Sequence, residues 1–284
     1  SQVEQTLLAA EKDLDLACGK LQFFNHPTND VWVRDYGPIY LRHSDSGKVA
    51  LTEWEYTAWG GKYPFELDKQ IPARIREATG VPGFQQSLVL EGGAIEPNGV
   101  GDLLVTNDCL SNPNRNRGVS KEEIETALTD TLGVSKVHWL DGCIEGDDTN
   151  GHIDNLVRFF KPDGILLAEQ PNKDDANYDS LARLGKQCRE IRLNDGRSLE
   201  VVNLPLPEAV YGIDRRLPMS YLNFFIGNEV VYAPAYGQPG PDSRALEILE
   251  SVFPGRAIVP IDCRDLIREG GALHCLTQQV PQTS

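Results

Sequence analysis

Apolar and polar residues follow one another in a repeating order along the chain, with a helical pattern first and a short apolar run after it. The helical patterns cover residues 3–18, 67–79, 121–132, 175–190 and 242–252. Apolar runs typical of strands follow them at residues 21–24, 87–90, 136–140, 199–204 and 257–261. Because the helices begin roughly 50–70 residues apart, the pattern indicates five copies of one α/β unit.

Local signals between these elements support the same division. Ser120 with Glu123 predicts a capped start for the third helix, and glycines follow four of the five helices, at Gly19, Gly80, Gly133 and Gly255. Further strand signals lie at residues 39–41, 49–52, 103–105, 156–160, 165–167, 223–226 and 230–232, and turns at 162–164 and 227–228 predict hairpins. Since no linker divides the sequence, a single domain over residues 1–284 is expected.

A polar or glycine-bearing segment follows each strand of the five units. These segments cover residues 29–37, 91–94, 145–154, 211–223 and 268–275. Residues 90–95 and 268–273 resemble each other, since each contains Glu-Gly-Gly-Ala. Five units that present one such loop at the same end would surround a central site. An ordinary α/β protein with a chance similarity between two loops is the alternative.

Composition narrows the class of partner. The 284 residues are 40% hydrophobic, as in a folded protein, and no apolar run is long enough to span a membrane. A formal charge of −15 argues against nucleic acid or an anionic membrane and favours a cationic substrate, although solubility alone also explains it. The six cysteines are dispersed and the first residues do not form a signal peptide, so a cytoplasmic location is expected.

Cys275, near the end of the chain, has the most nucleophilic type of side chain in that region. It follows His274, and the pair is preceded by Gly270 and Gly271. Glycine lets the backbone turn sharply, so the thiol is a candidate nucleophile. The alternative is a buried cysteine that serves only as a small apolar side chain.

Carboxylates and a second histidine occur in two other loops. Asp35 precedes a Gly-Pro turn, where its carboxylate can face a cleft or pair with Arg34. The nearby Trp32 is a core residue or a face for a flat cation. In an extended segment, His152 and Asp154 point to the same side and combine an acid/base group with a carboxylate.

A metal site is the competing interpretation of these residues. His152 and Asp154, together with His274 and Cys275, would form a four-ligand set. Their spacing is not compact and neither pair lies on a metal-binding helix or knuckle, so no metal or cofactor is expected.

A guanidinium group suits a thiolate, a histidine and two carboxylates. The anionic groups need a countercharge, and a guanidinium is planar, cationic and able to meet carboxylates at two points. Cys275 would attack its carbon, His152 would protonate the departing ammonia, and a thiouronium would remain on sulfur. Water activated by His152 would then release a ureido product.

Six segments resemble those of the agmatine deiminase and bacterial-type peptidylarginine deiminase family, in the guanidine-modifying pentein superfamily. They are residues 32–38 (WVRDYGP), 59–63 (WGGKY), 90–93 (LEGG), 149–155 (TNGHIDN), 220–224 (SYLNF) and 274–279 (HCLTQQ). The resemblance extends over residues 29–281 in matching order. It implies a five-bladed α/β propeller.

The same resemblance assigns roles to individual positions. It implies that Cys275 is the nucleophile, that His152 is the acid/base, and that Asp35 and Asp154 clamp the guanidinium. It places Trp32 and Asn223 in the substrate channel, gives Glu91 a supporting role, and leaves Asp148 as a ligand for a second positive charge. Family members usually open with a further strand, whereas Ser1 already lies within the first predicted helix. The first blade is therefore expected to be incomplete.

The leading hypothesis is a cytoplasmic agmatine deiminase that converts agmatine and water to N-carbamoylputrescine and ammonia. Arginine or peptidyl-arginine is the closest rival substrate and would need a cation at the pocket rim, for which Arg115, Arg117, Arg215 and Arg216 are candidates. A metal-dependent guanidine hydrolase and a non-catalytic guanidine-binding protein are more remote. A homodimer is left open.

Overall fold

The structure is a computed structural model that describes residues 22–282. Its strands form four three-stranded sheets. In chain order the strands are β1 (Ile39–Arg42), β2 (Val49–Glu55), β3 (Gly83–Val89), β4 (Ile95–Pro97), β5 (Asp102–Thr106), β6 (Lys136–Leu140), β7 (Val157–Lys161), β8 (Gly164–Glu169), β9 (Glu200–Pro205), β10 (Phe225–Ile226), β11 (Val230–Ala235) and β12 (Ala257–Asp262).

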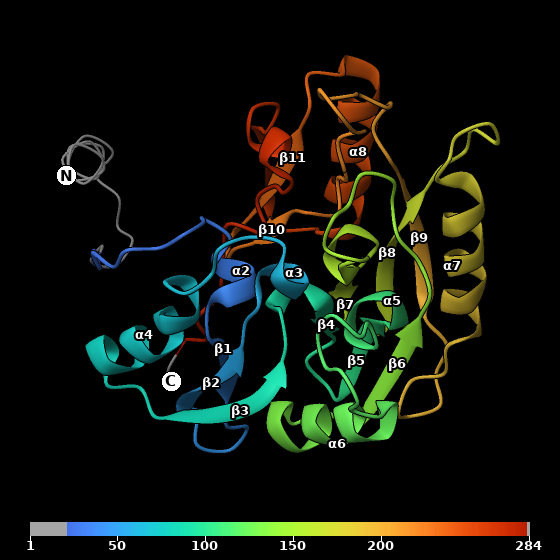
Figure 1. Ribbon diagram of the computed structural model, residues 1–284. Helices are drawn as coiled ribbons and strands as arrows, with labels where there is room; N and C mark the ends of the chain where they lie inside the picture. Colours follow the sequence, from blue (N-terminus) through green and yellow to red (C-terminus); the bar gives the residue numbers. More distant parts are fainter. Residues whose placement is uncertain (1–21, 283–284) are drawn as a thin grey trace.

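All four sheets share one topology. The first two strands form an antiparallel pair, and the third strand lies parallel to the second. A parallel pair needs a long crossover, which a helix supplies in every unit. The crossover helices are α4 (Ile71–Thr79), α6 (Lys121–Leu132), α7 (Tyr178–Glu190) and α8 (Pro239–Val252). Figure 1 shows these helices at the periphery with the strands between them.

The middle strand of each sheet lies between two hydrogen-bonded neighbours, which favours a buried, apolar sequence. All five residues of β5 are buried, as are the first five residues of β8. Sheets whose parallel strands are joined by crossover helices define an α/β fold, as predicted. None of the helices within residues 22–282 is long and apolar enough to cross a membrane.

Four of the five predicted helices lie in the described residues and are confirmed: α6 has the predicted bounds, and the other three end as predicted but begin at different residues. The Ser120 capping box and the left-handed Gly133 delimit α6 as predicted. The starts of α4 and α8 are set by prolines in their first turns, Pro72 and Pro239. The predicted helix over residues 3–18 lies outside the described residues.

One predicted strand is not formed within the described residues, and one observed strand was not predicted. Gln22, Phe23 and Phe24 are exposed and irregular, because no strand within residues 22–282 pairs with them, and Leu21 lies outside that range. Conversely, β4 was not predicted, since a three-residue strand ending in proline has no clear alternation. It forms because its backbone pairs with the buried strand β5.

Short helical elements carry or directly adjoin most residues of the predicted site. These are α2 (Val33–Tyr36), α3 (Ala58–Gly61), η2 (Gly92–Ala94), η3 (Ile153–Asn155) and η4 (Leu266–Glu269). The segments α2 and η3 both contact η2. Loops from the start, middle and end of the chain thus meet in one region. The remaining short helices are η1 (Asp68–Gln70) and α5 (Asn107–Leu110).

Candidate active site

Cys275 lies just beyond η4, and its side chain is 6% exposed. The amide of Asn223 donates to Sγ at 3.2 Å, and the thiol lies 3.7 Å from Oδ2 of Asp154. A Cβ on Gly271 would lie 2.7 Å from the ring of Trp32, so only glycine fits there. Burial, together with the charges of Asp154 and Asp35, raises the pKa of the Cys275 thiol well above its ordinary value.

Asp35 is fixed in α2 by two donors. Its Oδ2 accepts a hydrogen bond from the indole nitrogen of Trp59, and its Oδ1 accepts one from the backbone nitrogen of Gly93, both at 3.0 Å. A Cβ on Gly93 would lie 2.5 Å from Nδ1 of His152, so the backbone can approach only as glycine. Burial raises the pKa of Asp35, and the nearby Glu91 adds to this effect. The ion pair between Asp35 and Arg34 that the sequence left as an alternative is not formed. Arg34 Nε instead donates to the backbone carbonyl of His274.

Trp59 has a role that the sequence analysis did not assign. It and Ala58 adopt left-handed backbone conformations, with φ of 56° and 46°. Such conformations are costly for residues other than glycine and are found at constrained functional sites. This backbone conformation directs the Trp59 indole toward Asp35, to which it donates its hydrogen bond. The sequence signal was the tryptophan next to Gly60 and Gly61 in a motif already recognised by resemblance.

His152 is fully buried between two carboxylates. Its Nε2 lies 3.0 Å from Oε2 of Glu91, and its Nδ1 lies 3.7 Å from Oδ1 of Asp35. Burial alone would lower the pKa of His152, but the charge of Asp35 and hydrogen bonds with Cys109 and Glu91 raise it well above its ordinary value. The imidazole is therefore held as a cation, which makes it a proton donor.

Asp154 lies in η3, so the extended segment considered for His152 and Asp154 is not formed. The chain turns there because Asn150 and Gly151 both have positive φ. Its Oδ2 is 2.8 Å from Nδ1 of His274, whereas Oδ1 has no hydrogen-bond partner among the residues the structure describes. Burial raises the pKa of Asp154 to about 7. The free oxygen is a ready acceptor for a cationic ligand.

Glu91 is held by Arg115, a residue that the sequence analysis considered only for the pocket rim. Arg115 Nε and Nη2 donate to the two oxygens of Glu91 at 2.8 and 3.1 Å. Both side chains are 1% exposed. Despite its burial, Glu91 has a lowered pKa because of His152 and Arg115. Arg115 thus keeps ionised the carboxylate that orients the imidazole.

Removal of this arginine should destabilise the protein. Arg115→Met leaves the Glu91 carboxylate buried without its cation, so we expect the free energy of unfolding to fall by about 3 kcal/mol. Urea denaturation followed by circular dichroism measures the change. The neighbouring exposed Arg117 provides a control, because Arg117→Met should leave the midpoint nearly unchanged. Equal midpoints for both variants would contradict the proposed importance of the pair.

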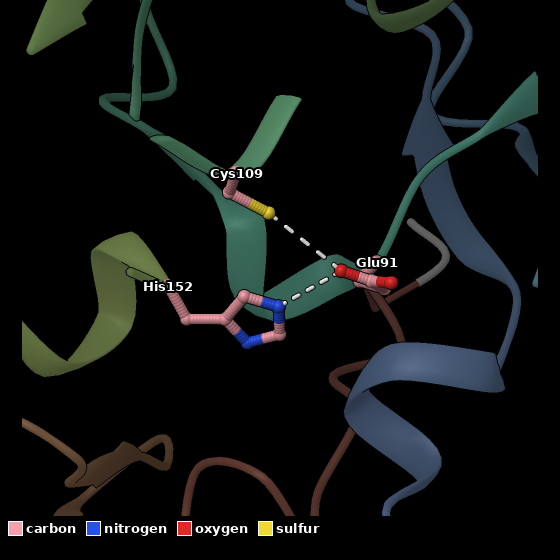
Figure 2. A group of neighbouring side chains, drawn as sticks. All are labelled: Glu91, Cys109 and His152. Atoms are coloured by element: carbon pink, nitrogen blue, oxygen red, sulfur yellow. Dashed lines mark hydrogen bonds and ion pairs between the residues drawn. The ribbon is translucent and has the colours of Figure 1, made fainter. Parts of the chain in front are cut away.

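Cys109 completes a buried group of potential metal ligands. Figure 2 shows the side chains of Cys109 and His152 pointing toward Glu91, and Cys109 Sγ lies 3.7 Å from Glu91 Oε2. These three residues lie close enough to share an ion, whereas the set considered from the sequence is not such a group among the described residues. Because Arg115 already occupies both oxygens of Glu91, an ion would compete with a buried guanidinium. The geometry favours a hydrogen-bonded support for His152.

A cavity of about 300 Å³ opens beside these residues. Its buried part is lined by Trp32, Asp35 and Cys275, and its more exposed part includes Tyr63, Asp148 and Arg215. His152, Asp154, Glu91 and Asn223 are buried behind this wall. Asn223 therefore holds Cys275 from behind, and its assignment as a channel residue stays a prediction.

Comparison with known proteins assigns a class to this arrangement. The model of the Porphyromonas-type peptidyl-arginine deiminase family matches residues 1–281. The chain belongs to this family of deiminases.

Several relatives and solved structures that the chain resembles are agmatine deiminases. The agmatine deiminase of Pseudomonas syringae pv. tomato is 36% identical over 278 residues, which cover 89% of this chain and 75% of that protein. A solved agmatine deiminase of Enterococcus faecalis has a TM-score of 0.88 at 30% identity, covering 92% of this chain and 77% of that one. A solved cysteine-to-serine variant of the Campylobacter jejuni enzyme with substrate bound has a TM-score of 0.87 at 29% identity, covering 97% and 80%.

Proposed function

We propose that this protein hydrolyses agmatine to N-carbamoylputrescine and ammonia through a covalent intermediate on Cys275. The observation that carries the proposal is a buried thiol 3.7 Å from a carboxylate whose other oxygen has no partner among the described residues. The agmatine deiminase names of relatives at 36% and 37% identity support the choice of substrate.

The charges of the pocket explain why a guanidinium binds. Asp35, Asp154 and the Cys275 thiolate would repel one another if all were ionised in the empty site. A bound guanidinium between the two carboxylates provides the countercharge in a planar form that carboxylates recognise. The same cation lowers the pKa of the thiol, because it cancels the charges of Asp154 and Asp35 that raise it. Substrate binding therefore favours the reactive thiolate.

The reaction proceeds in two stages. The thiolate of Cys275 attacks the guanidinium carbon, a carbon–sulfur bond forms, and one carbon–nitrogen bond breaks. His152 supplies the proton with which that nitrogen leaves as ammonia, and a thiouronium remains on sulfur. Water then attacks the same carbon while His152 accepts its proton. The carbon–sulfur bond breaks, which releases N-carbamoylputrescine and restores the thiol group.

The surrounding residues are assigned supporting roles in this proposal. Glu91 orients His152 through the 3.0 Å contact with Nε2, which leaves Nδ1 toward Asp35. Asn223 positions Cys275, and Trp32 forms an apolar wall of the cavity. Asp148 provides a negative charge at the exposed part for the distal ammonium of agmatine.

A substrate panel tests the function. Agmatine, arginine and an arginyl peptide are compared for release of ureido product and ammonia. We expect the highest kcat/KM for agmatine. Preference for arginine or the peptide would replace agmatine as substrate but keep the deimination chemistry. Release of urea would contradict that chemistry.

Agmatine affinity should depend on pH. The pKa of Asp154 is about 7, so the carboxylate is largely protonated below that pH and ionised above it. The guanidinium stays charged throughout and binds the ionised form. In Cys275→Ala, which cannot react, we expect affinity to fall about tenfold per pH unit below about pH 7 and to level off above about pH 8. Calorimetric titration measures this profile, and a flat profile would contradict the role of Asp154.

The wider architecture is also part of the proposal. Four repeated units in residues 22–282, together with the helix predicted over residues 3–18, support a single-domain, five-bladed α/β propeller. We place the protein in the cytoplasm, which its described free cysteines support. A homodimer is compatible with this proposal.

A further inference from the structure

We propose that Arg215 forms an internal ion pair with Asp148, and that the distal ammonium of the substrate displaces Arg215 from this carboxylate when it binds. Arg215 would then set the affinity for guanidines that carry a second positive charge. This inference rests on the proposed function. It concerns substrate selectivity rather than the reaction at Cys275.

The contacts of Asp148 define the competition. Arg215 Nη1 lies 2.8 Å from Oδ2 of Asp148, and the hydroxyl of Tyr63 donates to the same oxygen at 2.7 Å. The Lys62 ammonium donates to the backbone carbonyl of Asp148. Asp148, Tyr63 and Arg215 all line the cavity that contains Cys275. A ligand cation that reaches Asp148 therefore meets an oxygen already bound by a guanidinium.

One wall of the cavity joins this carboxylate to the buried one. The Trp59 indole donates to Asp35, and the Trp59 and Tyr63 rings meet edge to face with centroids 5.7 Å apart. Tyr63 in turn donates to Asp148. The cavity thus presents two acids along one aromatic wall. This pattern matches a molecule with a cation at each end.

The environment of Arg215 suits a displaceable group. Its side chain is 38% exposed and that of Asp148 is 26% exposed, and ion pairs this accessible to solvent contribute little. The neighbouring Arg216 is different, since it is 5% exposed and bound to Asp175 at 2.8 Å. Arg216 anchors the loop, whereas Arg215 extends to the cavity. Ile213, two residues before Arg215, is 99% exposed, so its side chain does not hold the loop against the rest of the protein.

A second reading of Arg215 predicts the opposite effect. If its guanidinium instead received the carboxylate of free arginine, its removal would impair arginine and leave agmatine unaffected. The cavity lining favours the first reading, because its acids outnumber its cations and so attract a cation and repel a carboxylate. The acids are Asp30, Asp35, Asp148 and Glu269, and the cations are Arg215 and Arg268.

Kinetics of Arg215→Gln with agmatine and with 1-guanidinobutane, which lacks the distal amine, test the proposal. We expect KM for agmatine to fall about two- to fivefold with kcat nearly unchanged, as for loss of a weak competing ion pair. KM for 1-guanidinobutane should stay the same. Arg215→Lys retains the competing charge and should resemble the wild type. Arg197→Gln removes an arginine from an exposed ion pair remote from the cavity lining and serves as the matched control.

Asp148→Asn completes the comparison. It should raise KM for agmatine toward that for 1-guanidinobutane, and adding Arg215→Gln to it should produce no further gain for agmatine. An unchanged or higher agmatine KM in Arg215→Gln would overturn the proposal, as would an equal change for both substrates. If the wild type released no ureido product from either guanidine, the proposed function would fail. Turnover of both without a selective effect of Arg215→Gln would reject only the displacement model.

Discussion

Cys275→Ala should lower agmatine turnover by at least about ten-thousandfold, because no other group can form the covalent bond to the guanidinium carbon. The cavity walls and both carboxylates remain, so agmatine should still bind. Steady-state assays for ureido product measure the loss of turnover. Calorimetry measures binding. Loss of activity with binding retained is the result expected for a nucleophile.

The exposed Cys143 offers a matched control for this substitution. Cys143→Ala removes a thiol that does not line the cavity and should keep wild-type kcat and KM. Near-normal turnover by Cys275→Ala would remove the thiol from the mechanism. Equal losses in the two variants would point to a general effect on folding instead.

Asp35→Asn and Asp154→Asn should each raise the activation free energy by about 3–5 kcal/mol, which lowers kcat/KM by about 150- to 5,000-fold. The change keeps the shape of each side chain but removes the charge that a buried guanidinium needs. Both carboxylates are at most 4% exposed, so water cannot readily compensate. The same assay with varied agmatine measures the effect.

Asp262→Asn is the control for the carboxylate variants. Asp262 forms an exposed ion pair with Arg264, and its charge should not matter for catalysis. Near-normal kcat/KM in both Asp35→Asn and Asp154→Asn would show that these residues do not clamp the substrate. A loss in only one variant would reduce the clamp to a single carboxylate.

The sequence predicted those parts of the fold whose signals are local. The limits of α6 were predicted because Ser120, Glu123 and Gly133 act on the adjacent backbone. Phe23 and Phe24 are apolar, yet residues 22–24 remain irregular, because a strand also needs a partner strand. The strand β4 shows the converse, since pairing with β5 creates a strand that local pattern does not indicate.

The same distinction between local signals and tertiary contacts applies to the site. Reactive residue types in separate loops predicted a shared centre, and the structure brings Cys275 to Asp154 and His152 to Asp35. The supports of these residues were not predictable in detail, because the Trp59 and Arg115 contacts depend on tertiary packing. The Trp59 indole reaches Asp35 across 24 residues, and Arg115 reaches Glu91 across the same separation.

The most direct test of the account is the mass of the Cys275 peptide during turnover. Wild-type protein reacting with agmatine is quenched in acid at times from milliseconds to steady state, digested and examined by mass spectrometry. We predict that this peptide gains the mass of agmatine less ammonia and loses it when substrate is exhausted. An unmodified Cys275 at every time point, or the same adduct on another residue, would contradict covalent deimination at this thiol.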